Sequence, residues 1–206
     1  MAKPQTFSKS RVEALTDGIF SVVMTLLVLD VKLPSNLGSL TDAELWSVLA
    51  SFEPRLSAYM ISFIVSAVFW LGHHALMHRV QSVDRVFLWL NLGFLFCLTF
   101  LPFTADLIGE HPHVQSAVLL YGINLLMILS LQWLLWRYLY QHAELQEGEM
   151  TPADSEDLSR RYQLTLLIAV AAVALSFVSP RASIFTYALW VFVVLLRLRA
   201  PRRLSR

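Results

Sequence analysis

The sequence predicts an all-α, polytopic membrane protein with six transmembrane helices per chain, because its apolar residues form long runs and its charges lie between them. Hydrophobic residues make up 56% of the 206 positions and charged residues only 15%, a balance that a soluble domain does not bury in one core. The runs without Asp, Glu, Lys or Arg are 18–29, 56–77, 86–105, 114–136, 162–180 and 182–196. Four of them reach about 19 residues or more, enough to cross about 30 Å of hydrocarbon.

The positions of Lys and Arg support the same helix count and give an orientation. With a cytoplasmic N-terminus, six crossings place 13 of the 16 basic residues on the inner side and leave only Lys32, Arg55 and Arg181 outside. Cytoplasmic loops of membrane proteins carry this excess of Lys and Arg. We therefore predict a multi-pass protein with both termini cytoplasmic.

The whole chain, 1–206, is predicted to be one membrane domain, with helices at about 11–33, 55–78, 84–107, 114–140, 158–179 and 182–198. The first apolar run has only 12 residues, so Asp17 or Asp30 at its ends must enter protein-lined or watery surroundings. The last run has 15 residues, and Arg181 and Arg197 can extend it by reaching the two interfaces.

A short helix over 41–53 is predicted to lie at the outer interface. Thr41 and Glu44 have the spacing of a capping box, and Pro54 starts the next crossing. In the third crossing, Pro102 falls near the outer end, where the loss of a backbone hydrogen bond costs least. Residues 141–157 contain six Asp or Glu residues and no Lys or Arg. This composition indicates a solvated loop on the inner side.

One narrow face of the first helix combines small, hydroxylated and branched apolar side chains. At 100° per residue, Gly18, Val22, Thr25 and Leu29 fall within about 60°, and Ser21 lies beside them. Such a face is typical of a helix-packing seam in lipid. It is also suited to line a pore, in which branched side chains make a dewetting constriction and a hydroxyl replaces part of an ion's hydration shell.

The segment 11–31 resembles the first helix of the transmembrane-protein-175 family of potassium channels, in its short bacterial form with six helices per chain. The family motif is Arg, three residues, then Phe-Ser-Asp. Arg11 and Asp17 match it, whereas Leu15 and Thr16 replace the aromatic residue and the serine. Further points of resemblance are Trp70 with His73, Asn91-Leu92 and Pro102-Phe103.

The resemblance implies a homotetramer whose pore is lined by the first helix, with potassium as the permeant ion and no cofactor. Val22 would be the hydrophobic constriction and Thr25 the hydroxyl layer that favours potassium. Leu29 would be the next apolar ring, to which Leu26 could contribute. Asp30, near the outer mouth, would concentrate cations.

The resemblance also implies a polar network that fixes the inner half of the first helix, formed by Arg11, Thr16, Asp17, Trp70, His73 and Asn91. The alternative for Arg11 is a positive charge at the inner interface. His74 and His78 are four residues apart and could bind a metal, but no carboxylate or cysteine accompanies them, and we predict no metal site.

We therefore predict a potassium-selective channel in the plasma membrane of a bacterium, with membrane lipid, potassium ions and copies of itself as partners. No nucleophile elbow, phosphate loop or paired intramembrane carboxylate indicates an enzyme. A net charge of +1 gives no support for a nucleic-acid partner. Two alternatives stay open: a proton-coupled secondary transporter that uses Asp17 or His73, and a structural membrane protein that conducts nothing.

Overall fold

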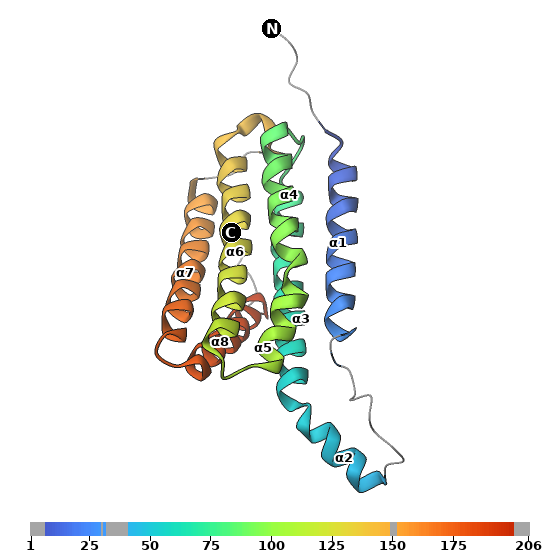
Figure 1. Cartoon of the computed structure of the whole chain (residues 1–206). Helices are drawn as coiled ribbons and strands as arrows, with labels where there is room; N and C mark the ends of the chain where they lie inside the picture. The colour runs from blue at the N-terminus through green and yellow to red at the C-terminus, as the bar shows by residue number, and fades with distance from the viewer. Residues whose placement is uncertain (1–6, 30, 32–40, 149–151, 200–206) are drawn as a thin grey trace.

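The computed structural model describes residues 7–29, 31, 41–148 and 152–199, and these residues form an all-α bundle, as the sequence predicts (Figure 1). In chain order the helices are α1 (Lys9–Leu29), α2 (Asp42–Ser51), α3 (Glu53–Met77), α4 (Arg85–Thr99), α5 (Leu101–Glu110), α6 (Gln115–Gln141), the short 3-10 helix η1 (Ala143–Leu145), α7 (Pro152–Ser176) and α8 (Pro180–Arg199).

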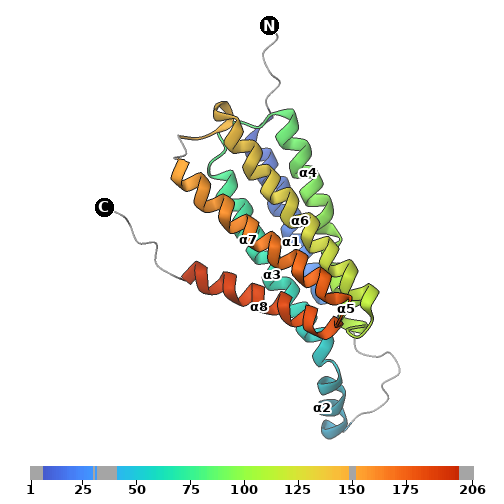
Figure 2. The ribbon, with the colours of Figure 1, turned by 90° about the vertical axis from the view of Figure 1, so that its left-hand side faces the viewer.

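Five segments of the described chain are long and apolar enough to cross a membrane. They are Lys9–Leu29, Arg55–Met77, Arg85–Glu110, Gln115–Gln141 and Leu158–Ser176. Helix α8 occupies the place of the sixth predicted crossing and runs obliquely to α7 (Figure 2). Its side chains from residue 191 onward lie outside the described set.

The third crossing is bent, where the sequence predicted one continuous helix over 84–107. Helix α4 ends at Thr99, Phe100 caps it, and α5 begins at Leu101. Pro102 explains the bend, because its ring clashes with the carbonyl group four residues earlier and it has no N–H to donate. The backbone N–H of Thr104 still donates to the Phe100 carbonyl at 3.1 Å, so the crossing continues past the bend.

Helix α6 is the centre of the bundle and α1 lies at its edge (Figure 1). Helix α6 packs against α4, α5, α7 and α8, and Gly122 lets α8 approach because even a methyl group there would collide with the Tyr187 hydroxyl. Helix α1 packs only against α3, α4 and α5 among the described elements. Among the described elements, one side of α1 is therefore left without a packing partner.

The predicted capping box of α2 is confirmed. The Glu44 carboxylate accepts hydrogen bonds from the Thr41 backbone N–H and hydroxyl, both at 2.8 Å, and the Glu44 N–H donates to the Thr41 hydroxyl oxygen. The backbone hydrogen bond, followed by that of the hydroxyl, lowers the pKa of Glu44 below its ordinary value. The large apolar side chains Leu45, Trp46 and Leu49 of α2 are exposed, as expected for a helix at an interface.

Candidate pore helix

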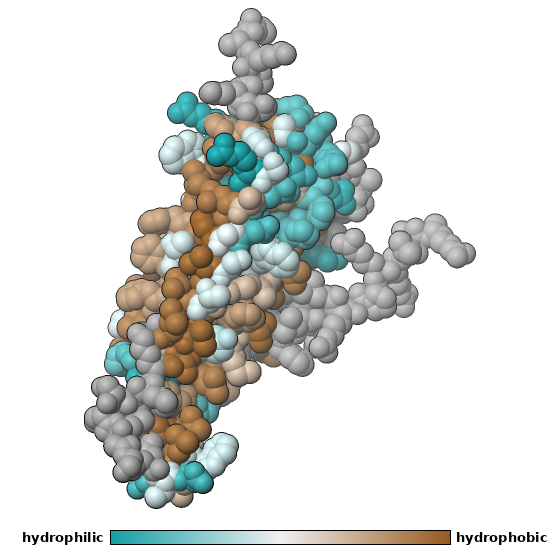
Figure 3. Space-filling view, turned by 90° about the vertical axis from the view of Figure 1, so that its right-hand side faces the viewer, coloured by the Kyte–Doolittle hydropathy of each residue, from teal (hydrophilic) through white to brown (hydrophobic). Residues whose placement is uncertain are grey.

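Helix α1 has two opposite faces, one buried in the chain and one exposed. The buried face packs on α3, α4 and α5 and consists of Val12, Thr16, Phe20, Val23 and Leu27. The opposite face is a continuous hydrophobic band along the helix (Figure 3). Exposed apolar surface of this length is stable only against lipid or another protein surface.

The predicted pore-lining residues all lie on this exposed face. The exposed fractions are 55% for Val22, 41% for Leu26 and 58% for Leu29, and Thr25 is exposed as well. None of the four belongs to the buried face of α1 in the described part of the chain. Asp30, the predicted charge at the outer mouth, lies outside the described residues.

A groove of about 300 Å³ follows the exposed face beside Gly18, Val22 and Leu26, and Thr99 of α4 lines one side of it. A Cβ atom at Gly18 would meet no other atom within 4 Å. The packing of this chain alone therefore gives no steric reason for glycine at this position. Glycine here leaves room for the close approach of another helix.

The Thr25 hydroxyl is arranged to present its oxygen outward. It donates within the helix, to the carbonyl oxygens of Ser21 and Val22, both at 2.9 Å. A hydroxyl has one proton and two acceptor lone pairs, so this use of the proton leaves acceptor capacity on the exposed face. Ser21, which donates to the Asp17 carbonyl at 2.8 Å, is arranged in the same way.

The buried face of α1 is held by a chain of polar contacts that crosses three helices. His73 Nε2 lies 2.7 Å from Asn91 Oδ1, and Asn91 Nδ2 donates to Thr16 Oγ1 at 3.2 Å. Because the Asn91 oxygen accepts, His73 Nε2 is the donor. All three residues are buried, and Phe94 stacks on the His73 ring with centroids 5.2 Å apart. These contacts join α1, α3 and α4.

A second contact joins α1 to α3 one turn away. Trp70 Nε1 donates to Asp17 Oδ1 at 2.9 Å. The structure thus brings Thr16, Asp17, Trp70, His73 and Asn91 to one region, in two separate groups of contacts. Arg11 is not part of either group: its side chain is exposed and makes no hydrogen bond or ion pair with another side chain of the described ranges.

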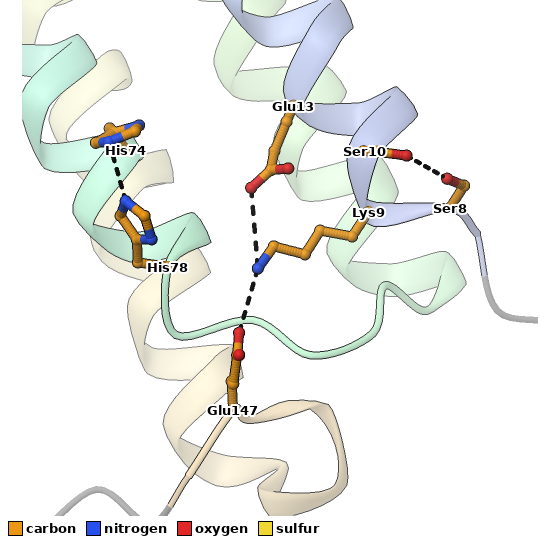
Figure 4. Close-up of polar contacts among 7 residues, drawn as sticks. All are labelled: Ser8, Lys9, Ser10, Glu13, His74, His78 and Glu147. Atoms are coloured by element: carbon orange, nitrogen blue, oxygen red, sulfur yellow. Dashed lines mark hydrogen bonds and ion pairs between the residues drawn. The ribbon is translucent and has the colours of Figure 1, made fainter.

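Lys9, and not Arg11, makes the side-chain ion pairs at the start of α1 (Figure 4). Its Nζ atom lies 3.3 Å from Glu147 Oε2 and 3.9 Å from Glu13 Oε1. Phe7 also pairs with Val83 through their backbones. No local sequence signal could have indicated the contact to Glu147, which is 138 residues away.

Replacing Asn91 by leucine is expected to lower the free energy of unfolding by about 1–3 kcal/mol, because the buried His73 N–H and Thr16 hydroxyl would lose their partner. Thermal unfolding in detergent would measure it, at roughly 2–4 °C per kcal/mol for a chain of this size. Asn124→Leu is the matched control and should cost less. Its partner, the Thr104 hydroxyl, keeps acceptors at the Phe100 and Leu101 carbonyls. Equal losses in both variants would contradict this account.

Lys9→Gln is expected to leave the melting temperature almost unchanged. The side chains of Lys9 and Glu147 are 27% and 63% exposed, and exposed ion pairs contribute about 0–1 kcal/mol. The same thermal measurement shows whether the Lys9–Glu147 ion pair or the buried hydrogen bonds of Asn91 contribute more to the stability. A loss as large as that of Asn91→Leu would mean that the ion pair, and not the buried amide, holds α1 in place.

Three comparisons place the chain among known proteins. The family model described as endosomal/lysosomal potassium channel TMEM175 matches residues 11–102, which include α1, α3 and α4. A potassium channel of Chryseobacterium sp. (strain P1-3) is 30% identical over 190 residues, which cover 92% of this chain and 93% of that protein. The endosomal/lysosomal proton channel TMEM175 of Mus musculus is 28% identical over 196 residues, 93% of this chain but 38% of that protein.

A solved structure agrees with the fold over nearly the same length. The crystal structure of a lysosomal potassium-selective channel TMEM175 homolog from Chamaesiphon minutus matches with a TM-score of 0.79 and 28% identity. The match covers 93% of this chain and 98% of that one. The likeness therefore extends beyond the helices that carry the motif, to the second half of the bundle.

Proposed function

The chain belongs to the TMEM175 family, and on this premise we propose that it is a potassium-selective channel that conducts passively through a homotetrameric pore lined by α1. The family is one of ion channels, and the chain is not an enzyme. The observation that carries the proposal is the exposed apolar face of α1, in which the hydroxyl oxygen of Thr25 lies between Val22 and Leu29.

Several copies are needed because the described part of one chain presents a single face of this kind, on α1. Identical chains arranged around an axis would turn the same face of each α1 inward and close a ring. The groove beside Gly18 leaves space for the neighbouring helix. The number four rests on the family resemblance of the first helix.

In this pore, Val22 forms the narrowest ring, where branched apolar side chains exclude water and so hinder ions. Thr25 forms the next layer, and its outward oxygen replaces part of the hydration shell of potassium. Leu26 and Leu29 continue the apolar wall. From the sequence, Asp30 completes the outer mouth as a cation-attracting charge.

We place the protein in the plasma membrane of a bacterium with both termini in the cytoplasm. The sorting of 13 of the 16 basic residues to one side supports this orientation. Its partners are lipid, potassium ions and its own copies, and conduction of this kind needs no cofactor. The Lys9–Glu147 contact and the end of α3 then lie on the inner side.

Flux from purified protein in liposomes under a potassium gradient tests the proposal. We expect passive potassium flux that exceeds sodium and chloride flux. Absence of flux, or equal permeability to all three ions, rejects it. A flux that saturates and follows an imposed proton gradient would favour the coupled transporter. Native mass spectrometry is the second test, since a protein that stays monomeric cannot form this pore.

A further inference from the structure

Two histidines at the end of α3 face each other over one helical turn (Figure 4). His74 Nε2 lies 3.0 Å from His78 Nε2, and the two rings are nearly perpendicular, with an interplanar angle of 83°. Both side chains are exposed. From the sequence we predicted no metal site at this pair, because no carboxylate or cysteine accompanies it. The structure adds the observation that the two nitrogens converge, and the proposal below departs from that prediction.

The distance between the two nitrogens suits a metal ion. With metal–nitrogen bonds of about 2.0–2.1 Å, two histidine nitrogens lie about 2.9 Å apart at the right angles of a Cu²⁺ or Ni²⁺ site and about 3.3 Å apart at the tetrahedral angle of zinc. In the metal-free pair, the N–H of one imidazole points at the lone pair of the other. A rotation of the rings that turns both Nε2 lone pairs to a common point makes the pair a chelate, with the former donor ring in the neutral tautomer that carries its proton on Nδ1. Trp70 stacks on His74 with centroids 5.3 Å apart and limits the rotation of that ring.

A group of charged side chains lies on the side of α1 that faces the pair. Lys9, on the facing side of α1, is paired with both Glu13 and Glu147, so these three side chains carry a net charge of −1. Figure 4 shows the Glu13 carboxylate on the side of α1 that faces the two histidines. Arg79, the residue after His78, carries the opposite charge, so the case for a metal depends on the two converging nitrogens.

We propose that His74 and His78 form a two-ligand site for a first-row transition-metal dication such as Cu²⁺, Ni²⁺ or Zn²⁺, with water in the remaining positions. No group of three or more His, Cys, Asp or Glu side chains that could hold a metal occurs within the described ranges. The site therefore binds an exchangeable ion and not a structural one. The affinity should rise from Mn²⁺ through Ni²⁺ to Cu²⁺. The proposal rests on α3 and not on ion conduction.

Calorimetric titration of Ni²⁺ into the full chain in detergent, purified without a polyhistidine tag, tests the site. We expect one strong site per chain in the parent. In each single variant, His74→Gln and His78→Gln, the affinity for Ni²⁺ should fall at least about tenfold. The second metal–nitrogen bond of the chelate is intramolecular, and each variant loses it. The matched control for the double variant is His111→Gln with His113→Gln, which removes two exposed histidines at the opposite end of the helix bundle and should leave the strong site unchanged.

Two results would overturn the proposal. The first is equal affinity in the parent and in the double variant His74→Gln/His78→Gln. The second is an electron paramagnetic resonance spectrum of bound Cu²⁺ in the parent that shows one imidazole nitrogen instead of two. This spectrum is recorded on the unchanged protein, so it stays decisive even if a variant does not fold.

Discussion

Replacing Val22 by alanine is expected to raise the potassium flux of the reconstituted protein several-fold. A ring of valines excludes water because its methyl groups narrow the passage and offer no hydrogen bonds. Alanine removes two methyl groups from each copy, so the ring becomes wider and easier to hydrate. The side chain is 55% exposed in the chain, so the substitution leaves no cavity in the core. The measurement is potassium flux from liposomes at equal protein content.

Val28→Ala is the matched control for this experiment. Val28 is also a valine of α1 and is 48% exposed, but at 100° per residue it lies about 120° away from Val22 around the helix. The same loss of methyl groups there should leave the flux near that of the parent. If Val22→Ala and Val28→Ala give the same flux as the parent, the constriction is assigned to the wrong residue. If Val28→Ala alone raises the flux, α1 turns the face that carries Val28, and not the face that carries Val22, toward the pore axis.

The sequence was sufficient for the fold class because the bilayer imposes simple rules on it. Apolar runs of sufficient length must be helical in lipid, since no water is present to satisfy the backbone. The all-α architecture and the family are confirmed. The bend at Phe100 was not expected in the predicted helix 84–107, although Pro102 was recognised. A proline has a known local effect, but the packing of α5 against α3 and α6 decides how far the chain turns.

The candidate site could be predicted only in part, because local periodicity and tertiary contact are different kinds of information. The spacing of Val22, Thr25 and Leu29 predicted a common face, and the structure shows that face exposed. Whether this face lines a pore depends on how other copies of the chain are arranged around it. In the polar network, the side chains of α3 and α4 reach α1 as the resemblance implied. Arg11 does not take part, and Lys9 makes the long-range contact instead.

Replacing Thr25 by valine is expected to reduce the preference for potassium over sodium by about tenfold, which corresponds to about 1.4 kcal/mol. Valine has nearly the shape of threonine, so the width of the pore changes little. What is lost is the oxygen, whose proton is used within the helix at 2.9 Å and whose lone pairs remain for the ion. Without that oxygen, an ion that sheds water at this layer has no replacement ligand. The measurement is the potassium-to-sodium permeability ratio from reversal potentials.

Thr165→Val separates this effect from a general loss of helix hydrogen bonds. The Thr165 hydroxyl donates to the Arg161 carbonyl at 2.8 Å on α7, which is the same local arrangement on a helix that does not line the proposed pore. Its replacement should leave the permeability ratio unchanged. If Thr25→Val keeps the ratio of the parent while Val22→Ala still raises flux, α1 lines the pore but selects ions elsewhere. Val22→Ala changes the width of the passage, whereas Thr25→Val changes its chemistry. Together the two variants distinguish the constriction from the ion-selecting layer.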